Sequence, residues 1–329
     1  METSNSGHRP SWSVPFVAGA VIAAVTLGAI GSAGAANRPA PRGATTSSFT
    51  TADGRTRTFR VYVPRSLPRN QRVPLLVALH GGLGSGAQFE SNSGFDQLAD
   101  VHHFIVVYPD GIPIRSSGVL ANARVWNGGH CCGPAARLQV DDVGFISQLI
   151  DWVSQRHSID PGRVYAAGHS NGAIMAYRLA CELSDKIVAI GVQAGSLETD
   201  GCRPSRPVSV LHIHGTADRN IPIEGGRGDG VAGIAFQPPH AAVTTFAQLD
   251  GCPTASSTVT SPTNADVTIE TWQPCREGAT VEFVRVAGAS HAWMGHASPR
   301  AARALTGAPY MGYDSSAAIW AFLAAHPRH

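Results

Sequence analysis

The sequence predicts an α/β fold, in which a mostly parallel β-sheet is covered by helices on both faces. Short apolar, β-prone runs recur along the chain, and segments with apolar residues at helical spacing separate several of them. Strands that alternate with helices are typical of parallel sheets. Residues 49–329 show no internal repeat, no heptad pattern and no Ser/Thr/Pro-rich linker, so we expect a single domain there.

The expected strands and helices follow one another in a regular order. The β-prone runs are residues 58–64, 74–80, 104–108, 163–167, 187–192, 209–214 and 281–286. The helical patterns are residues 141–155, 171–183, 241–249 and 315–325. A glycine-rich insertion at residues 224–237 has no clear pattern, and its path is left open.

The composition is that of a globular chain without a strongly charged surface. Of its 329 residues, 43% are hydrophobic, which is enough for a large core. The net charge at pH 7 is only +2, and Lys186 is the only lysine. A basic surface of the kind that binds nucleic acid is therefore not expected.

The N-terminus has the features of a signal peptide, which we place at residues 1–36. Residues 14–30 are apolar and uncharged, and the small residues after them favour cleavage after Ala35 or Ala36. Residues 37–48 are then expected to be a disordered stretch. An uncleaved membrane anchor is the second interpretation, because the apolar run is about long enough to span a bilayer. The sequence thus predicts an extracellular protein without a membrane contact after cleavage.

An exported chain with an even number of cysteines is expected to form disulfides. The six cysteines are Cys131, Cys132, Cys181, Cys202, Cys252 and Cys275. The last two are close in sequence and predict a local disulfide. We expect Cys131 and Cys132 to pair with Cys181 and Cys202, because adjacent cysteines bridge each other only with strain. The sequence has no paired Cys-x-x-Cys spacing, so these cysteines are not expected to bind a metal. No cofactor is expected either.

The segment Gly168-His-Ser170-Asn-Gly172 stands between a β-prone run and a helical pattern. A serine at such a strand-to-helix turn is exposed at the edge of the sheet, and the small residues on either side let strand and helix pass closely. The five-residue pattern alone is weak in a chain with 36 glycines. Its position between strand and helix makes it a candidate nucleophile elbow.

A serine hydroxyl needs a base that takes its proton and a third group that orients the base. In α/β-hydrolases these residues follow one another in the order Ser, Asp, His. Asp218 and His291 each come just after an expected strand, downstream of Ser170. The carboxyl ends of parallel strands meet at one edge of a sheet, so we predict that Ser170, Asp218 and His291 form a catalytic triad in an α/β-hydrolase fold.

Other titratable residues compete for these roles. His296 is the nearest rival as the base, but His291 is closer to the end of its strand. His212 and His214 alternate on one expected strand and could imitate a metal pair, although no third ligand is evident. Asp141 and Asp142 open the expected helix of residues 141–155 and are interpreted as capping and supporting residues.

An oxyanion needs backbone N–H donors beside the serine. The glycine-rich turn after residue 80 offers the amide of Gly82 or of Leu83, and the amide of Asn171 would complete the hole. Trp126 and Trp293 are candidates for the substrate-binding surface, with burial in the core as an equal alternative.

Six short motifs together carry a family resemblance. They are Leu79-His-Gly-Gly82, Trp126-Asn-Gly-Gly-His-Cys-Cys-Gly133, Val140-Asp-Asp-Val-Gly-Phe145, Gly168-His-Ser-Asn-Gly172, His214-Gly-Thr-Ala-Asp218 and His291-Ala-Trp-Met-Gly295. With these motifs the chain resembles the polyhydroxybutyrate depolymerase and feruloyl esterase-like family of secreted α/β-hydrolases. The resemblance extends from about residue 45 over nearly the whole remaining chain.

The resemblance implies a carboxylic ester hydrolase with Ser170, Asp218 and His291 as its triad. His169, Ala173 and Met294 depart from the family pattern, which affects the expected substrate preference more than the expected activity. Polyester-degrading members usually resemble this domain plus a polymer-binding module. No such module is evident here, so a soluble or polysaccharide-borne feruloyl or acetyl ester is the favoured substrate.

The functional prediction is thus a secreted serine esterase that works through an acyl-enzyme. A hydroxyalkanoate depolymerase and an acyltransferase with the same triad are the alternatives, and a non-catalytic binding protein ranks last. The oligomeric state is not predicted.

Overall fold

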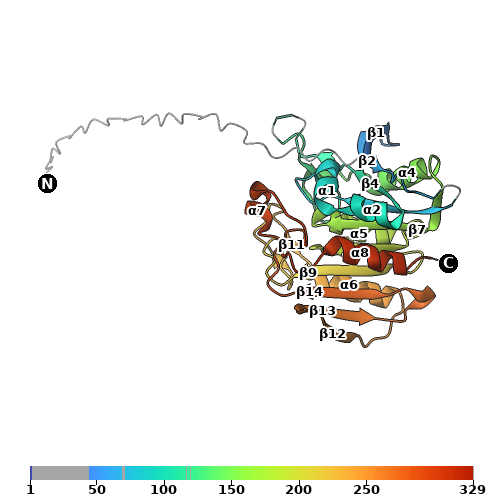
Figure 1. The fold of residues 1–329 in the computed structure, drawn as a ribbon. Coiled ribbons are helices and arrows are strands. Elements are labelled where there is room, and N and C mark those ends of the chain that lie inside the picture. The colour runs from blue at the N-terminus through green and yellow to red at the C-terminus, as the bar shows by residue number, and fades with distance from the viewer. Residues whose placement is uncertain (2–43, 69–70, 116, 119, 329) are drawn as a thin grey trace. The chain divides into compact units, whose positions relative to one another are not determined.

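A computed structural model describes Met1 and residues 44–68, 71–115, 117–118 and 120–328 (Figure 1). Residues 2–36 of the predicted signal peptide and residues 37–43 lie outside this part of the chain. No helix within the described ranges is long and apolar enough to cross a membrane.

Ten strands form one central sheet, in the order β1-β2-β4-β3-β7-β8-β9-β14-β13-β12. The six strands from β4 to β14 are parallel, and the outer pairs on both sides are antiparallel. Their bounds are β1 (Ala44–Thr50), β2 (Thr56–Tyr62), β3 (Val73–Leu79), β4 (Ile105–Pro109), β7 (Ile159–His169), β8 (Ala189–Gln193), β9 (Ser209–Gly215), β12 (Ser257–Ser261), β13 (Asn264–Trp272) and β14 (Val281–Val286). Two short ladders pair β5 (Ile112–Pro113) with β6 (Arg124–Val125), and β10 (Gly226–Arg227) with β11 (Ala235–Phe236).

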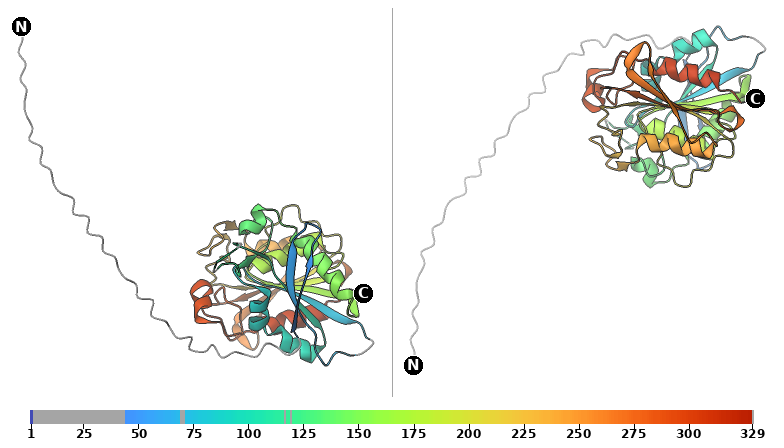
Figure 2. Two further views of the ribbon diagram at one scale, coloured as in Figure 1. Left: turned by 90° about the horizontal axis from the view of Figure 1, so that it is seen from above. Right: turned by 90° about the horizontal axis from the view of Figure 1, so that it is seen from below.

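Helices cover both faces of this sheet (Figure 2). One face carries α4 (Asp142–Ser154), α5 (Asn171–Glu182) and α6 (Pro239–Leu249); the other carries α1 (Gly86–Ser93), α2 (Phe95–His102) and α8 (Ser315–Ala325). The remaining helical segments are short: α3 (Gly133–Arg137), η1 (Arg276–Gly278) and α7 (Arg300–Thr306). The predicted fold class, a mostly parallel sheet covered on both faces, is confirmed.

The hydrophobic core is divided into two layers by the sheet. Phe145, Tyr177 and Phe246 pack in the layer under α4 to α6, and Phe95 and Trp320 pack in the layer under α2 and α8. The second layer includes a close aromatic stack, in which the rings of Phe104 and Trp320 are 3.6 Å apart. Because α5 is buried on almost every side, it is held in a fixed position at the centre of the sheet.

The outer strands differ from the sequence-based expectation. Residues 44–48, expected to be disordered, form most of β1 and pair with β2. The hairpin of β12 and β13 was not predicted either. Residues 257–261 are polar or exposed, and they carry no alternating apolar pattern. These edge strands are formed by backbone pairing with a neighbour, which a single-strand pattern does not reveal.

The disulfides confirm one predicted pair and correct the others. Cys252 bonds to Cys275 as expected. Cys181 bonds to Cys202, with a Cα–Cα distance of 4.8 Å, and Cys131 bonds to its neighbour Cys132. The predicted cross-pairing is wrong because Cys181 lies near the far end of α5, about 16 Å along the helix from Ser170, whereas Cys131 and Cys132 lie near the serine.

Candidate active site

Ser170 occupies a sharp turn between β7 and α5. Its backbone has φ 56° and ψ −121°, a conformation that non-glycine residues rarely adopt and that is maintained here by the close packing of strand and helix. A Cβ atom at Gly172 would collide with the carbonyl oxygen of Leu79, and one at Gly168 would collide with that of Gly172. The two glycines therefore permit the close passage that the sequence predicted.

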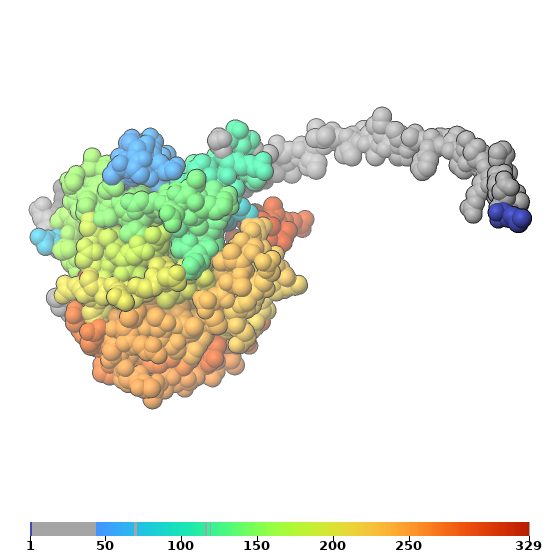
Figure 3. All heavy atoms as spheres, turned by 180° about the vertical axis from the view of Figure 1, so that it is seen from behind, coloured from blue at the N-terminus to red at the C-terminus, as the bar shows by residue number. Residues whose placement is uncertain are grey.

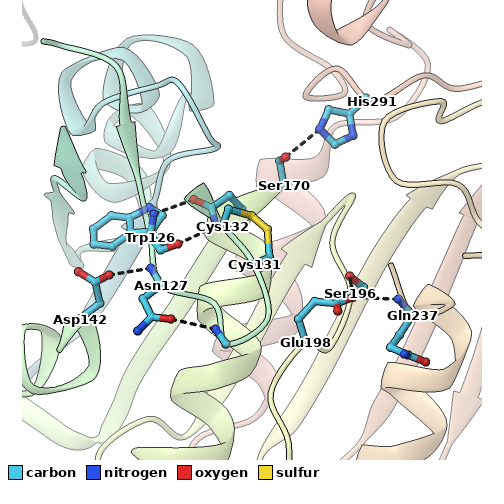
Figure 4. Close-up of a disulfide and its surroundings, with 12 residues drawn as sticks. Trp126, Asn127, Cys131, Cys132, Asp142, Ser170, Ser196, Glu198, Gln237 and His291 are labelled. Carbon is cyan, nitrogen blue, oxygen red and sulfur yellow. Dashed lines mark hydrogen bonds between the residues drawn. A yellow bond between two sulfur atoms is a disulfide. The ribbon is translucent and has the colours of Figure 1, made fainter. Parts of the chain in front are cut away.

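The structure brings the three predicted triad residues into one hydrogen-bonded line. The Oγ of Ser170 lies 2.9 Å from Nε2 of His291, and Nδ1 of His291 lies 2.8 Å from Oδ2 of Asp218. Asp218 follows β9 and His291 follows β14, which are neighbours in the sheet. Figure 4 shows the Ser170–His291 contact. In this arrangement the imidazole can accept the serine proton, and the carboxylate fixes its tautomer.

The Asp218 carboxylate is kept ionised by its surroundings. Its Oδ1 accepts hydrogen bonds from the backbone N–H groups of Asn220 and Ile221, at 2.8 and 3.0 Å. Burial by itself opposes ionisation, but the charge and hydrogen bond of His291 and the N–H of Ile221 outweigh it, so the pKa of Asp218 is lowered. An ionised Asp218 can stabilise an imidazolium at His291.

Ser170 opens into a cavity of about 970 Å³. Its walls come from the turn after β3, the segment of the adjacent cysteines, the 224–237 insertion, and the loop from His291 to α7. In the space-filling view of Figure 3, the green segment with α3 and the amber insertion lie side by side, next to the red α7. The insertion that had no predictable path is thus a wall of the cavity.

The turn after β3 narrows the choice of oxyanion donors. The N–H of Leu83 donates to the carbonyl of Arg124 at 2.9 Å, so this part of the prediction is corrected. Within the described residues, the N–H groups of Gly82 and Asn171 have no acceptor. Both residues line the cavity next to Ser170.

The two tryptophans have different positions. Trp126 is fully buried outside the cavity, its Nε1–H donates to the carbonyl of His80 at 3.0 Å, and it is therefore a core residue and not a substrate contact. Trp293 does line the cavity. Its Nε1–H donates to Ser316 Oγ at 3.0 Å, which fixes the ring in the wall.

His169 and Gln193 support the histidine loop, and the sequence did not assign them this role. The Nε2–H of His169 donates to the carbonyl of His291 at 2.7 Å, and burial lowers the pKa of His169 to about 3, so that it stays neutral. The side chain of Gln193 donates to the Ala292 carbonyl at 2.9 Å and accepts from Met294 N–H at 3.1 Å. His169 adjoins the serine in sequence, but Gln193 lies at the end of β8 without any motif to mark it.

His212 and His214 belong to a buried polar chain. Nε2 of His214 donates to the Ile221 carbonyl at 2.9 Å; its Nδ1 then accepts from Nε2 of His212 at 3.1 Å, and Nδ1 of His212 accepts from Tyr177 OH at 2.7 Å. Burial lowers the pKa of both imidazoles. In the described part of the chain, no group of three or more His, Cys, Asp or Glu side chains could hold a metal ion.

The acidic pair at the start of α4 is structural, as predicted. Asp141 caps the helix by accepting from Gly144 N–H at 2.8 Å. Asp142 is buried, pairs with Arg57 at 2.6 Å and accepts from Asn127 N–H at 2.8 Å. Desolvation raises the pKa of Asp142, although Arg57 opposes the shift. Neither carboxylate lines the cavity.

The sheet order, the strand-turn-helix serine and the loops after β9 and β14 define the class of the protein as an α/β-hydrolase. A solved acetyl xylan esterase from Aspergillus awamori shares this fold, with a TM-score of 0.54 and 15% identity over 79% of this chain and 97% of that chain. The model of the family described as esterase PHB depolymerase matches residues 58–266, and the chain belongs to this family.

Two curated relatives extend the comparison. Feruloyl esterase B of Piromyces equi is 32% identical over 239 residues, which are 70% of this chain and 42% of the relative. A bifunctional acetylxylan esterase/xylanase of Neocallimastix patriciarum is 26% identical over 250 residues, which are 75% of this chain and 32% of the relative. The chain therefore spans less than half the length of either relative.

Proposed function

We propose that this protein is a serine carboxylic ester hydrolase that works through an acyl-enzyme. The observation that carries the proposal is the hydrogen-bonded line from Ser170 through His291 to Asp218 at the surface of a large cavity. Membership of an esterase family supports the same activity.

In the proposed reaction, Ser170 Oγ attacks the ester carbonyl while its proton passes to Nε2 of His291. The N–H groups of Gly82 and Asn171 stabilise the oxyanion. His291 then gives the proton to the leaving alcohol, which leaves the acyl group on Ser170. A water molecule, deprotonated by His291, hydrolyses this acyl-enzyme and regenerates the serine.

The proposed substrates are feruloyl, acetyl or similar esters of polysaccharides, or small soluble esters. The names of the two curated relatives support this choice, although this chain covers only part of each. The family description also names PHB depolymerase, so a hydroxyalkanoate oligomer is the second candidate. An acyltransferase would use the same triad and differ only in the acceptor.

We also propose that the protein is extracellular. Within the described residues the six cysteines form three disulfides, a state that persists in oxidising compartments. Identifying the N-terminal residue of the exported protein would test this and locate the cleavage site.

The test of the activity is a panel of esters with Ser170→Ala as the control. The panel contains p-nitrophenyl acetate, methyl ferulate, acetylated xylan and a hydroxybutyrate oligomer. We expect hydrolysis of ferulate or acetyl esters, and a fall of at least about a thousandfold in the variant. Near-full activity of Ser170→Ala would refute the assignment. Turnover of the oligomer alone would favour the depolymerase, and faster reaction with an added alcohol would favour the transferase.

A further inference from the structure

One side of the cavity is formed by a compact group of apolar side chains, which we call the apolar wall. Its members line the cavity and pack in one hydrophobic cluster: Cys131, Cys132, Ile174, Ile221, Ala232 and Phe236. They come from four separate segments, namely the loop before α3, the first turn of α5, the turn after Asp218 and the 224–237 insertion.

The apolar wall lies beside the reacting serine. Ile174 is one helical turn beyond Ser170, and its N–H donates to the Ser170 carbonyl at 3.0 Å. Figure 4 shows the bond between Cys131 and Cys132 on the side of the serine away from His291. Cys132 is half-buried and presents this disulfide to the cavity, whereas Cys131 is fully buried behind it.

The apolar wall is also free of charge. Charged side chains do line other parts of the cavity. Arg137, Arg219 and Asp229 are examples, and all three are exposed to solvent. Arg219 and Asp229 form an ion pair with each other at 2.5 Å. A disulfide has no ionisable thiol and no strong hydrogen-bond donor, so the wall favours apolar carbon over a sugar hydroxyl or a charged group.

Glu198 holds two of the four segments in place. It is buried, and its Oε1 accepts from Gln237 N–H at 2.9 Å and from Ser196 Oγ at 2.7 Å. Its backbone carbonyl accepts from His130 N–H at 2.9 Å. Gln237 follows Phe236 and His130 precedes Cys131, so one residue positions the wall from both sides. Figure 4 shows Glu198 beside Gln237.

The two halves of an ester occupy different sides of this serine. His291 must give its proton to the leaving oxygen, so the alcohol half lies toward His291. Trp293, two residues further, belongs to that side and packs against Phe89 with 5.2 Å between ring centroids. The Cys131–Cys132 part of the apolar wall lies on the side of Ser170 away from His291 (Figure 4), and Ile174 belongs to the first turn of α5.

We propose that the apolar wall is an acyl-binding subsite in which the Cys131–Cys132 disulfide is a contact surface. It takes acyl groups that carry apolar carbon beyond an acetyl methyl, either alkyl or aryl. This inference rests on the proposed function, and it concerns a specificity that the three catalytic residues do not determine.

The test is kcat/KM for two series of esters. The first keeps p-nitrophenol as the alcohol and lengthens the acyl group from acetyl to butyryl and hexanoyl, with cinnamoyl as the aryl member. The second keeps the acetyl group and lengthens the alcohol. We expect kcat/KM to rise about fourfold per buried methylene in the first series, the factor that corresponds to the transfer of one methylene from water. The second series should be flat.

Two kinds of variant address the wall directly. Phe236→Ala removes the aromatic ring from the wall, so it should flatten the acyl series: the ratio of kcat/KM for the hexanoyl ester to that for the acetyl ester should fall toward one. The double variant Cys131→Ala, Cys132→Ala should act in the same direction. Its matched control is Cys252→Ala, Cys275→Ala, which also removes one disulfide but lies outside the cavity and should keep the wild-type series.

Glu198 is tested as a positioning residue. Glu198→Gln keeps the accepting Oε1 and should retain the acyl preference, whereas Glu198→Ala should lose it. A purely structural role would lower the melting temperature of both variants without changing the ratio of the hexanoyl to the acetyl rate.

The outcomes separate this inference from the proposed function. A flat acyl series, a preference in the alcohol series, or an unchanged preference in Phe236→Ala would overturn the subsite while acetate hydrolysis, lost in Ser170→Ala, upheld the esterase. If no ester is hydrolysed and a serine-directed phosphonate leaves Ser170 unlabelled, both proposals fail. If the double cysteine variant does not fold, the acyl series of Phe236→Ala still tests the subsite.

Discussion

The side chain of Asn171 makes two hydrogen bonds with the backbone of Trp126. Its Oδ1 accepts from Trp126 N–H at 2.7 Å, and its Nδ2 donates to the Trp126 carbonyl at 3.1 Å. The residue after the candidate nucleophile thus positions the segment that leads to Cys131. The backbone N–H of Asn171 has no acceptor among the described residues, and the residue lines the cavity. Asn171 therefore has two roles: its side chain holds Trp126, and its backbone N–H is a candidate oxyanion donor.

Replacing Asn171 by Ala tests this link. Both backbone groups of Trp126 would be left buried and unpaired, and we expect the free energy of unfolding to fall by about 3 kcal/mol. The backbone amide remains, so some hydrolysis should persist, with a weaker acyl preference. Urea unfolding and kinetics on the acyl series would measure the two effects. Wild-type stability with an unchanged series would contradict the role.

Gln193 is expected to affect catalysis without touching substrate. Gln193→Leu removes its bonds to Ala292 and Met294, so the His291 loop should shift and kcat should fall about tenfold or more. The side chain lies outside the cavity, so KM should change little. Gln193→Glu keeps the oxygen that accepts from Met294 N–H, so its kcat should fall less than that of Gln193→Leu. Steady-state kinetics on p-nitrophenyl acetate would show this, and an effect on KM alone would contradict it.

Gly172 is expected to tolerate no side chain. Gly172→Ala would place a Cβ against the carbonyl oxygens of Leu79 and His80, which are backbone atoms of the central strand and its turn. We expect a loss of stability of about 3 kcal/mol and loss of activity. Gly230→Ala is the control, since its Cβ would meet only Asn220, at 3.4 Å or more. Equal melting temperatures for the two variants would argue against this packing.

Asp96 should make stability depend on pH. Burial raises its pKa to about 7, although the hydrogen bond from Tyr108 OH at 2.7 Å opposes the shift. The unfolded pKa is about 3.9, so the folded state binds the extra proton between these values. The stabilising contribution is complete below about pH 4 and is lost as the pH rises to 7.

Asp96→Asn stays neutral and should avoid this loss. We expect it to raise the free energy of unfolding by about 4 kcal/mol at pH 8 and to match the wild type at pH 4. Asp185→Asn is the control, because Asp185 is exposed and its side chain makes no hydrogen bond or ion pair within the described residues. Urea titrations at the two pH values give the comparison, and a pH-independent difference would show that the carboxyl does not titrate as described.

The sequence by itself determined the features that are local or periodic. Alternating strands and helices indicated a mostly parallel sheet. Helices that connect parallel strands cover both faces of the sheet, so its strands are short runs of apolar residues. The serine turn could be recognised because a strand, two glycines and a helix are neighbours along the chain. Asp218 and His291 could be placed at the same edge, since parallel strands end together.

Only the tertiary structure decided the contacts between distant segments. Which cysteines bond, which amide of the β3 turn is free, and whether Trp126 is core or surface depend on distances that no local pattern encodes. Gln193 and Glu198 lie in no motif, and their importance comes from backbone groups that the fold leaves beside them. The apolar wall is the clearest case, because four segments must meet before Cys131, Ile174 and Phe236 form one surface.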